Sequence, residues 1–115
     1  MGNKKVYDLE ERTYLFAKNC RLTITKLTKT TSNIEDGKQL VRSSGSVAAN
    51  YIEANEKLGD KDFKFRLKIA RKEAKESVLW LKLLRDLNPN NNEIVNLINE
   101  SEELRKILSA IINKT

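Results

Sequence analysis

Two pairs of polar side chains stand three residues apart, a spacing that places both members of a pair on one face of a helix. Glu73 and Glu76 form a Glu-x-x-Glu pair, and Asn50 and Glu53 form the second pair. Metal sites between packed helices usually combine such glutamates with histidine, and the sequence contains no histidine. A site made of carboxylates alone is the remaining metal option, and ion pairing of Glu73 and Glu76 with arginine or lysine is the favoured one. We therefore predict no metal and no cofactor.

The nucleophiles of the chain lack the partners that catalysis requires. Without histidine, neither a Ser-His-Asp nor a Cys-His arrangement can form. The nearest approach to a phosphate-binding loop, the run from Ser43 to Ser46, lacks the Gly-Lys-Ser/Thr ending of such loops. Cys20 falls on an apolar stripe and is expected to be a small buried hydrophobic residue. The sequence predicts that the protein is not an enzyme.

A polar face runs along the middle of the chain. Its members recur at steps of four, four and three, so they share one helix face; they are Arg42, Ser46, Asn50 and Glu53. The face is either solvated or a hydrogen-bonded subunit interface in which Arg42 meets a carboxylate of a neighbour, such as Glu53 or Glu73. The small side chains from Ser43 to Ala49 leave the same choice, between an interface of subunits and close packing inside one bundle.

The segment from Asp60 to Leu87 carries two stripes on nearly opposite faces. Its apolar residues recur at steps of three and four, the spacing of one buried helix face. Its basic residues follow two positions out of phase, about 200° of helical rotation away; they are Lys61, Lys64, Lys68, Arg71, Lys72 and Lys75. Neighbours in this basic stripe lie about 5–6 Å apart, a scale that suits contact with several phosphates. The stripe is the predicted nucleic-acid-binding site, and the alternative is a solvated face.

The elements that must position these side chains are helices. Apolar residues at helical spacing predict four of them, at about 8–31, 33–58, 60–87 and 92–113, joined by short polar breaks. Joints this short force consecutive helices to pack antiparallel. No alternating pattern of convincing length indicates a sheet. The predicted fold is all-α, an up-down-up-down antiparallel four-helix bundle formed as a single domain by residues 1–115.

Capping residues and inward positions give finer predictions. The expected helix caps are Asp8, Ser32 with its partner Glu35, Asp60 and Asn92. Gly59 is expected to adopt a left-handed conformation between the second and third helices. Leu27, Thr31 and Leu58 continue the buried stripes of the first two helices. Three residues of the first helix lie off its stripe and either widen the core or face a neighbouring subunit: Tyr14, Leu15 and Leu22.

Composition bounds the class of protein. The chain of 115 residues has 22 Lys and Arg against 16 Asp and Glu, a formal net charge of +6. This excess permits nucleic acid or another anionic surface as partner. Cys20 is the lone cysteine, which allows no intramolecular disulfide and fits a reducing compartment. No apolar run has the length of a signal segment or a membrane span, so the expected location is the cytoplasm.

The run from Gln39 to Ala54, QLVRSSGSVAANYIEA, resembles the central signature of the four-helix bundle proteins encoded in intervening sequences of bacterial 23S ribosomal RNA genes. The opening segment from Tyr7 to Thr13 also looks like the start of that family. The third predicted helix supports the resemblance through Phe63, Leu67, Ala70, Glu73, Glu76, Trp80 and Leu81. The resemblance implies a ring-like homopentamer. It also implies kinship with the accessory proteins of diversity-generating retroelements, similar basic pentameric bundles that bind nucleic acid and a reverse transcriptase.

The preferred function is non-enzymatic binding of nucleic acid by an oligomeric bundle, through the basic stripe of the third predicted helix. RNA is favoured over DNA by the resemblance alone. The alternative is a structural or protein-binding scaffold module with no nucleic-acid role, in which the basic stripe is solvated. A homo-oligomer, a pentamer by the resemblance, is expected under either function, and no membrane partner is expected.

Overall fold

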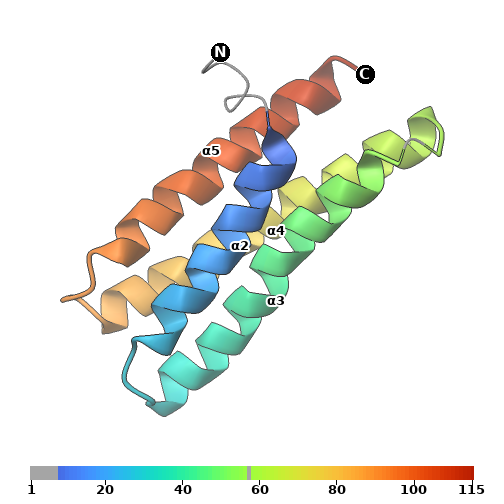
Figure 1. The fold of residues 1–115 in the computed structure, drawn as a ribbon. Helices are drawn as coiled ribbons and strands as arrows, with labels where there is room; N and C mark the ends of the chain where they lie inside the picture. Colours follow the sequence, from blue (N-terminus) through green and yellow to red (C-terminus); the bar gives the residue numbers. More distant parts are fainter. Residues whose placement is uncertain (1–7, 57) are drawn as a thin grey trace.

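Four helices account for most of the described chain (Figure 1). The computed structural model describes residues 8–56 and 58–115. Its helices are α2 (Leu9–Thr25), α3 (Thr31–Ala54), α4 (Asp60–Leu87) and α5 (Glu93–Asn113). These two stretches contain no strand, so the predicted all-α fold is confirmed. Tyr7, which the resemblance includes, lies outside the described residues.

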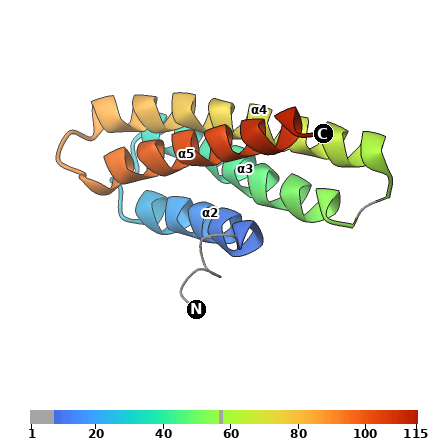
Figure 2. The same ribbon diagram turned by 90° about the horizontal axis from the view of Figure 1, so that it is seen from above.

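The helices pack as an antiparallel bundle in which each helix contacts the next, and α5 closes the bundle against α2. The α2–α3 and α4–α5 joints lie at one end of the bundle, and the α3–α4 joint lies at the other (Figure 1). Seen from above, α2 and α4 lie on opposite sides (Figure 2). The up-down-up-down topology is therefore confirmed. The contact between α3 and α4 is the most extensive of the four, and that between α2 and α5 is the smallest.

One stripe from each helix builds the core, because side chains three and four residues apart share a helix face. The apolar residues that α4 buries are Leu67, Ala70, Ala74, Val78, Leu81 and Leu84. Large buried side chains of the other helices include Phe16, Leu40, Val47, Ile94, Leu104 and Leu108. Each large side chain of this kind stabilises the fold by about 1.5–3 kcal/mol through removal from water.

The bounds of α4 agree with the prediction, and its flanking residues explain why. Gly59 has φ of +132° and ψ of 161°, a backbone conformation that residues with a Cβ rarely adopt. Its φ is positive as predicted, although ψ is extended rather than helical. The prediction that Asp60 caps the helix is wrong, because Gly59 itself occupies the N-cap position. Asp60 and Asp62 lie in the first turn, where carboxylates favour the positive end of the helix dipole.

The end of α2 and the start of α3 differ from the prediction. α2 ends at Thr25 rather than near residue 31. Thr30, not Ser32, caps α3, and its side chain accepts a hydrogen bond from the amide of Asn33 at 3.1 Å. Capping requires an extended backbone, which a helix continuing through residue 30 cannot supply. Thr31, predicted to be buried, is consequently the exposed first residue of α3, whereas Leu27 is partly buried against the core.

The end of α3 also comes earlier than predicted. The helix ends at Ala54 with Asn55 at its C-cap, four residues before the predicted end at Leu58. Ala54 is the last residue that α3 buries in the core. Leu58 lies beyond it in the joint to α4 and is 75% exposed. The prediction that Leu58 continues the buried stripe is wrong, because the chain has already left the core.

The two remaining caps gave one success and one error. Asp8 caps α2 as predicted, and its carboxylate accepts the amide of Glu11 at 3.0 Å. Asn92 stands at the N-cap position of α5 but makes no side-chain cap. The side chain of Asn91 instead accepts the amides of Glu93 and Ile94 at 2.9 and 3.2 Å. The residue before the N-cap therefore satisfies the first amides of α5.

Candidate nucleic-acid interface

The predicted basic stripe lies on α4 and is largely open to solvent. Lys64 and Arg71 are partly buried, and the other four members are exposed: Lys61, Lys68, Lys72 and Lys75. Across residues 8–56 and 58–115, no carboxylate forms an ion pair with Lys61, Lys64, Lys68 or Lys75. The span from Lys61 to Lys75 is about 21 Å of helix. Unpaired cations over that length are available to an anionic ligand.

Two members of the basic stripe make contacts within the chain. Arg71 donates a hydrogen bond to the hydroxyl of Ser109 on α5 at 3.3 Å. The amino group of Lys72 lies 3.8 Å from Glu73, with 71% of the lysine side chain exposed, and such exposed pairs contribute little stability. Lys72 is therefore still free to meet a ligand, whereas Arg71 is turned toward α5. We call the remaining five residues the α4 lysine row: Lys61, Lys64, Lys68, Lys72 and Lys75.

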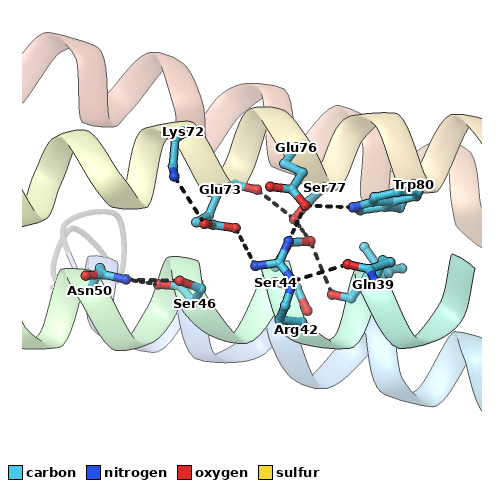
Figure 3. Close-up of polar contacts among 12 residues, drawn as sticks. Gln39, Arg42, Ser44, Ser46, Asn50, Lys72, Glu73, Glu76, Ser77 and Trp80 are labelled. Atoms are coloured by element: carbon cyan, nitrogen blue, oxygen red, sulfur yellow. Dashed lines mark hydrogen bonds and ion pairs between the residues drawn. The ribbon is translucent and has the colours of Figure 1, made fainter.

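Arg42 joins α3 to α4 through both members of the Glu-x-x-Glu pair (Figure 3). Its guanidinium donates to Glu73 at 3.2 Å and also to Glu76. Glu76 additionally accepts the indole N–H of Trp80 at 3.1 Å. Desolvation acts to lower the pKa of Arg42, but the hydrogen bond to Glu76 and the negative charges of Glu73 and Glu76 raise the pKa overall. The prediction that these carboxylates pair with arginine is confirmed, and the arginine belongs to the same chain.

The first small residues of the run from Ser43 to Ala49 pack inside the bundle. The hydroxyl of Ser43 shares a hydrogen bond of 2.7 Å with that of Ser77 on α4, and both residues are fully buried. Ser44 is also fully buried. Gly45 lies beneath Arg21 of α2, where a Cβ would stand 3.1 Å from the guanidinium. For Ser43, Ser44 and Gly45, the structure supports close packing within one bundle.

The rest of the predicted interface face shows local contacts. The side-chain amide of Asn50 donates to the carbonyl and the hydroxyl of Ser46, both at 3.0 Å. Glu53 is exposed, and Arg42 keeps 48% of its side chain exposed although it is bonded to α4. The role of Arg42, Ser46, Asn50 and Glu53 as a subunit interface therefore stays a prediction.

Cys20 is enclosed by the core, as predicted. Its side chain is fully buried, and burial raises the pKa of its thiol to about 12, an effect that a hydrogen bond with Ser44 opposes in part. A thiol that stays protonated is a poor nucleophile and a poor metal ligand. Within the two described stretches, no three or more acidic or cysteine side chains gather as metal ligands. No helix of these stretches is long and apolar enough to cross a membrane.

The seam between α2 and α5 contains a groove of about 570 Å³ that sequence reasoning missed. Phe16 and Leu97 line it and are almost fully buried. Leu15 and Leu22 also line it, yet they are 38% and 49% exposed. The sequence signal was present, since both leucines lie off the buried stripe of α2. The groove itself arises because α2 and α5 share the smallest interface in the bundle.

Two ion pairs connect α2 to α5 along this groove. Arg12 donates to both carboxylate oxygens of Glu100 at 2.7 and 3.0 Å, which raises the pKa of Arg12. Lys26 lies 3.1 Å from Glu93, and this hydrogen bond lowers the pKa of Glu93. Sequence reasoning missed both pairs. Because α2 and α5 are antiparallel, Arg12 near the start of α2 meets Glu100, whereas Lys26 at its end meets Glu93 at the start of α5.

Comparison with known proteins bears out the resemblance found in the sequence. The family of 23S rRNA-intervening sequence proteins matches residues 5–110. The chain is also similar to a crystal structure of a protein with unknown function, from the S23 ribosomal protein family of Bacteroides thetaiotaomicron VPI-5482. That similarity has a TM-score of 0.81 at 31% sequence identity and covers 90% of this chain and 94% of that one. No curated protein matches the chain. The kinship with retroelement accessory proteins stays a prediction.

Proposed function

This chain belongs to the family of 23S rRNA-intervening sequence proteins, and from that premise we propose that it is a non-enzymatic protein that binds nucleic acid through the α4 lysine row. The observation that carries the proposal is that most of this row forms no ion pair with a carboxylate of the described residues. Lysines on helices commonly pair with carboxylates one turn away, as Lys38 does with Glu35 and Lys106 with Glu103. Four of the five lysines in the α4 row have no such ion pair among the described residues, which leaves their charge available to phosphates.

Binding of this kind recognises the phosphate backbone. Each lysine amino group is a point charge without the fork geometry that reads base edges. Neutralised phosphates release their counterions, so the affinity depends strongly on salt and weakly on sequence. RNA is the preferred ligand because of the family to which the chain belongs, and DNA is a second arm of the test below.

One aromatic side chain favours unpaired over duplex nucleic acid. Phe65 lies on α4 between Lys64 and Lys68 and is 58% exposed. An exposed ring beside a row of cations offers a surface on which an unpaired base can stack, whereas bases inside a duplex are not accessible. Phe65→Ala should therefore weaken binding of single-stranded RNA more than binding of duplex.

The proposal includes assembly of several copies, with five as the number that the resemblance implies. Assembly repeats the α4 lysine row around the particle, so more phosphates are contacted at once and the affinity rises. The proposal also includes a cytoplasmic location, in keeping with the free thiol of Cys20, since reducing compartments keep cysteines unpaired.

A triple substitution tests the site. Lys61→Glu, Lys68→Glu and Lys72→Glu should abolish binding of labelled single-stranded RNA, structured RNA and duplex DNA at about 50 mM salt, where phosphate contacts are strong. The matched control carries the same charge change on other helices, at the exposed lysines Lys18, Lys38 and Lys106. The control should keep most of its binding. Equal losses in the two variants would show that net charge matters rather than the α4 row, and unchanged affinity in the first variant would remove α4 from the site.

A scaffold without a nucleic-acid role is the second candidate function. The exposed leucines of the α2–α5 groove and of α4 favour it, because contiguous apolar surface usually marks contact with protein. Recovery of one specific protein after nuclease treatment, together with no shift of RNA mobility at low salt, would support this function over the first.

A further inference from the structure

The last turns of α4 leave a row of leucines uncovered. Leu79, Leu83 and Leu87 are 50%, 38% and 59% exposed. Steps of four place them on one helix face, about 6 Å apart along the axis. Apolar side chains that are aligned in this way mark interaction sites more often than scattered ones do. We call these three residues the α4 leucine ridge.

The α2–α5 groove has the shape that such a ridge requires. Its two exposed leucines, Leu15 and Leu22, are separated by about 10.5 Å along α2, and the ridge is about 12 Å long. Helices pack when the side-chain row of one enters the groove between others. A single chain cannot bring its ridge to its own groove, because α4 lies diagonally across the bundle from α2 (Figure 2).

We infer that the α4 leucine ridge of one copy docks in the α2–α5 groove of a second copy. The inference rests on the assembly proposed above and names its contact surface. Ridge and groove are different surfaces, so the contact is heterologous, and each copy uses its ridge toward one neighbour and its groove toward the other.

Charged residues at one end of each surface favour one direction of docking. A hollow at the end of the groove near the start of α2 is lined by Asp8, Glu11, Arg12 and Leu15. Arg12 is paired with Glu100, whereas the carboxylates of Asp8 and Glu11 form no ion pair among the described residues. The ridge has the exposed Lys75, also without an ion pair among these residues, one turn before its first leucine. Lys75 meets these carboxylates when the ridge runs parallel to α2 of the neighbour.

Parallel docking is the arrangement that a ring of copies produces. In the up-down-up-down bundle, α2 and α4 of one chain run in the same direction, so rotation about an axis along the helices keeps α4 of each copy parallel to α2 of the next. A two-fold axis perpendicular to the helices would instead reverse them.

The ridge and the groove also lie at the same level along the bundle axis. The hydroxyl of Thr23 bonds to Glu93 at 3.2 Å, which places the end of α2 beside the start of α5. Asn33 and Asn88 exchange side-chain hydrogen bonds of 2.9 and 2.8 Å, which places the end of α4 at the same end of the bundle. Copies can therefore meet without a shift along the axis. Rotation without such a shift gives a closed ring, whereas a shift gives a filament.

This contact occupies Lys75, which lies one turn from the ridge, and leaves the rest of the α4 lysine row accessible. Lys68 precedes Leu79 by eleven residues, which is about 16 Å along the helix, and Lys61 and Lys64 lie farther away. The N-terminal half of α4 can thus hold RNA while its last turns hold the neighbouring copy.

Two one-sided variants test the inference by mass measurement in solution. Leu83→Glu spoils the ridge and leaves the groove intact, whereas Leu22→Glu spoils the groove and leaves the ridge intact. Each variant alone should run at the 13.2 kDa of one chain, and circular dichroism should show unchanged helix content. Mixed in equal amounts, they should form a dimer of about 26 kDa, because one intact ridge then meets one intact groove and no further contact can form. Ile52→Glu, on α3 with a similar exposure of 42%, is the matched control and should keep the mass of the wild type.

The outcomes separate this inference from the proposed function. An assembled wild type whose mass survives both Leu83→Glu and Leu22→Glu would overturn the ridge-in-groove contact and leave assembly standing. A 13.2 kDa wild type at micromolar concentration would overturn assembly and contact together. Loss of RNA binding by the α4 lysine variant with unchanged mass would concern the nucleic-acid site alone. A shift of the mixture to about 26 kDa is the result that supports the contact.

Discussion

Arg42→Ala removes the guanidinium that connects Glu73 and Glu76 of α4 to α3. Glu73 would then remain as a carboxylate with 7% exposure, and Lys72, at 3.8 Å, would be its nearest remaining cation. A charge that has lost its water and its partner destabilises the folded state. We therefore expect a loss of stability in the α3–α4 contact, the largest in the bundle.

The two ion pairs of Arg42 differ in their expected contributions. The pair with Glu76 is open to water, with 48% and 32% of the two side chains exposed, and such pairs contribute about 0–1 kcal/mol. The pair with Glu73 has one buried partner, and a hydrogen bond to a charged group contributes about 1.5–3 kcal/mol. Because the arginine itself is half exposed, water replaces part of the lost interaction. We expect Arg42→Ala to lower the free energy of unfolding by about 2–3 kcal/mol, less than the ~3–5 kcal/mol for a fully buried pair.

Urea unfolding at one fixed protein concentration measures this loss, since the stability of an oligomer depends on concentration. The midpoint should fall while the slope of the transition stays unchanged. Glu73→Gln in the Arg42→Ala background should restore part of the loss, because the buried charge is then gone. A loss below about 0.5 kcal/mol, the range of ordinary surface changes, would refute the reasoning. A fall in assembly mass at unchanged stability would instead assign Arg42 to the predicted subunit interface.

Two further predictions concern the core. Leu81→Ala should lower the free energy of unfolding by about 2–5 kcal/mol because the side chain is fully buried, and calorimetry or urea unfolding checks this; a loss below about 1 kcal/mol would contradict the assigned burial. The thiol of Cys20 should resist labelling at pH 8 until urea unfolds the chain, because burial raises its pKa to about 12. Its ordinary pKa is about 8.5, so the stability linked to the neutral thiol is fully present below that pH and declines as the pH rises toward 12. Labelling as fast in the native protein as in urea would contradict this prediction.

Helical periodicity predicted the fold because it reports burial directly. Leu67, Ala70 and Leu81 share one helix face, a spacing typical of a helix that buries that face. All three residues are fully buried. Helix ends are decided by single hydrogen bonds rather than by periodicity. The apolar spacing of the first predicted helix continued through Leu27, but the side chain of Thr30 accepts the amide of Asn33 and caps a new helix. The spacing of apolar residues does not indicate where such a cap forms.

The part of the candidate nucleic-acid site that lies on a single helix could be predicted from the sequence. The α4 lysine row follows from spacing within a single segment, whereas its availability depends on which carboxylates the fold brings near. Arg42 was predicted either to be solvated or to meet a carboxylate of a neighbouring copy, and the antiparallel packing of α3 on α4 places it against Glu73 and Glu76 of the same chain. The α2–α5 groove could not be derived from the pattern of Leu15 and Leu22, because its depth is set by how loosely two helices distant in sequence pack.

The central claim, that the α4 lysine row neutralises phosphates, is tested most directly by the salt dependence of single-stranded RNA binding between about 50 and 200 mM salt. Fluorescence anisotropy gives the slope of log affinity against log salt, and the four lysines that docking leaves free on one engaged copy predict a slope of about −2.8. Lys68→Ala should flatten the slope by about 0.7 for each copy engaged, and the control Lys38→Ala, on α3, should leave it unchanged. No binding by the wild type at about 50 mM salt, or the same slope in the wild type and Lys68→Ala, would contradict the claim.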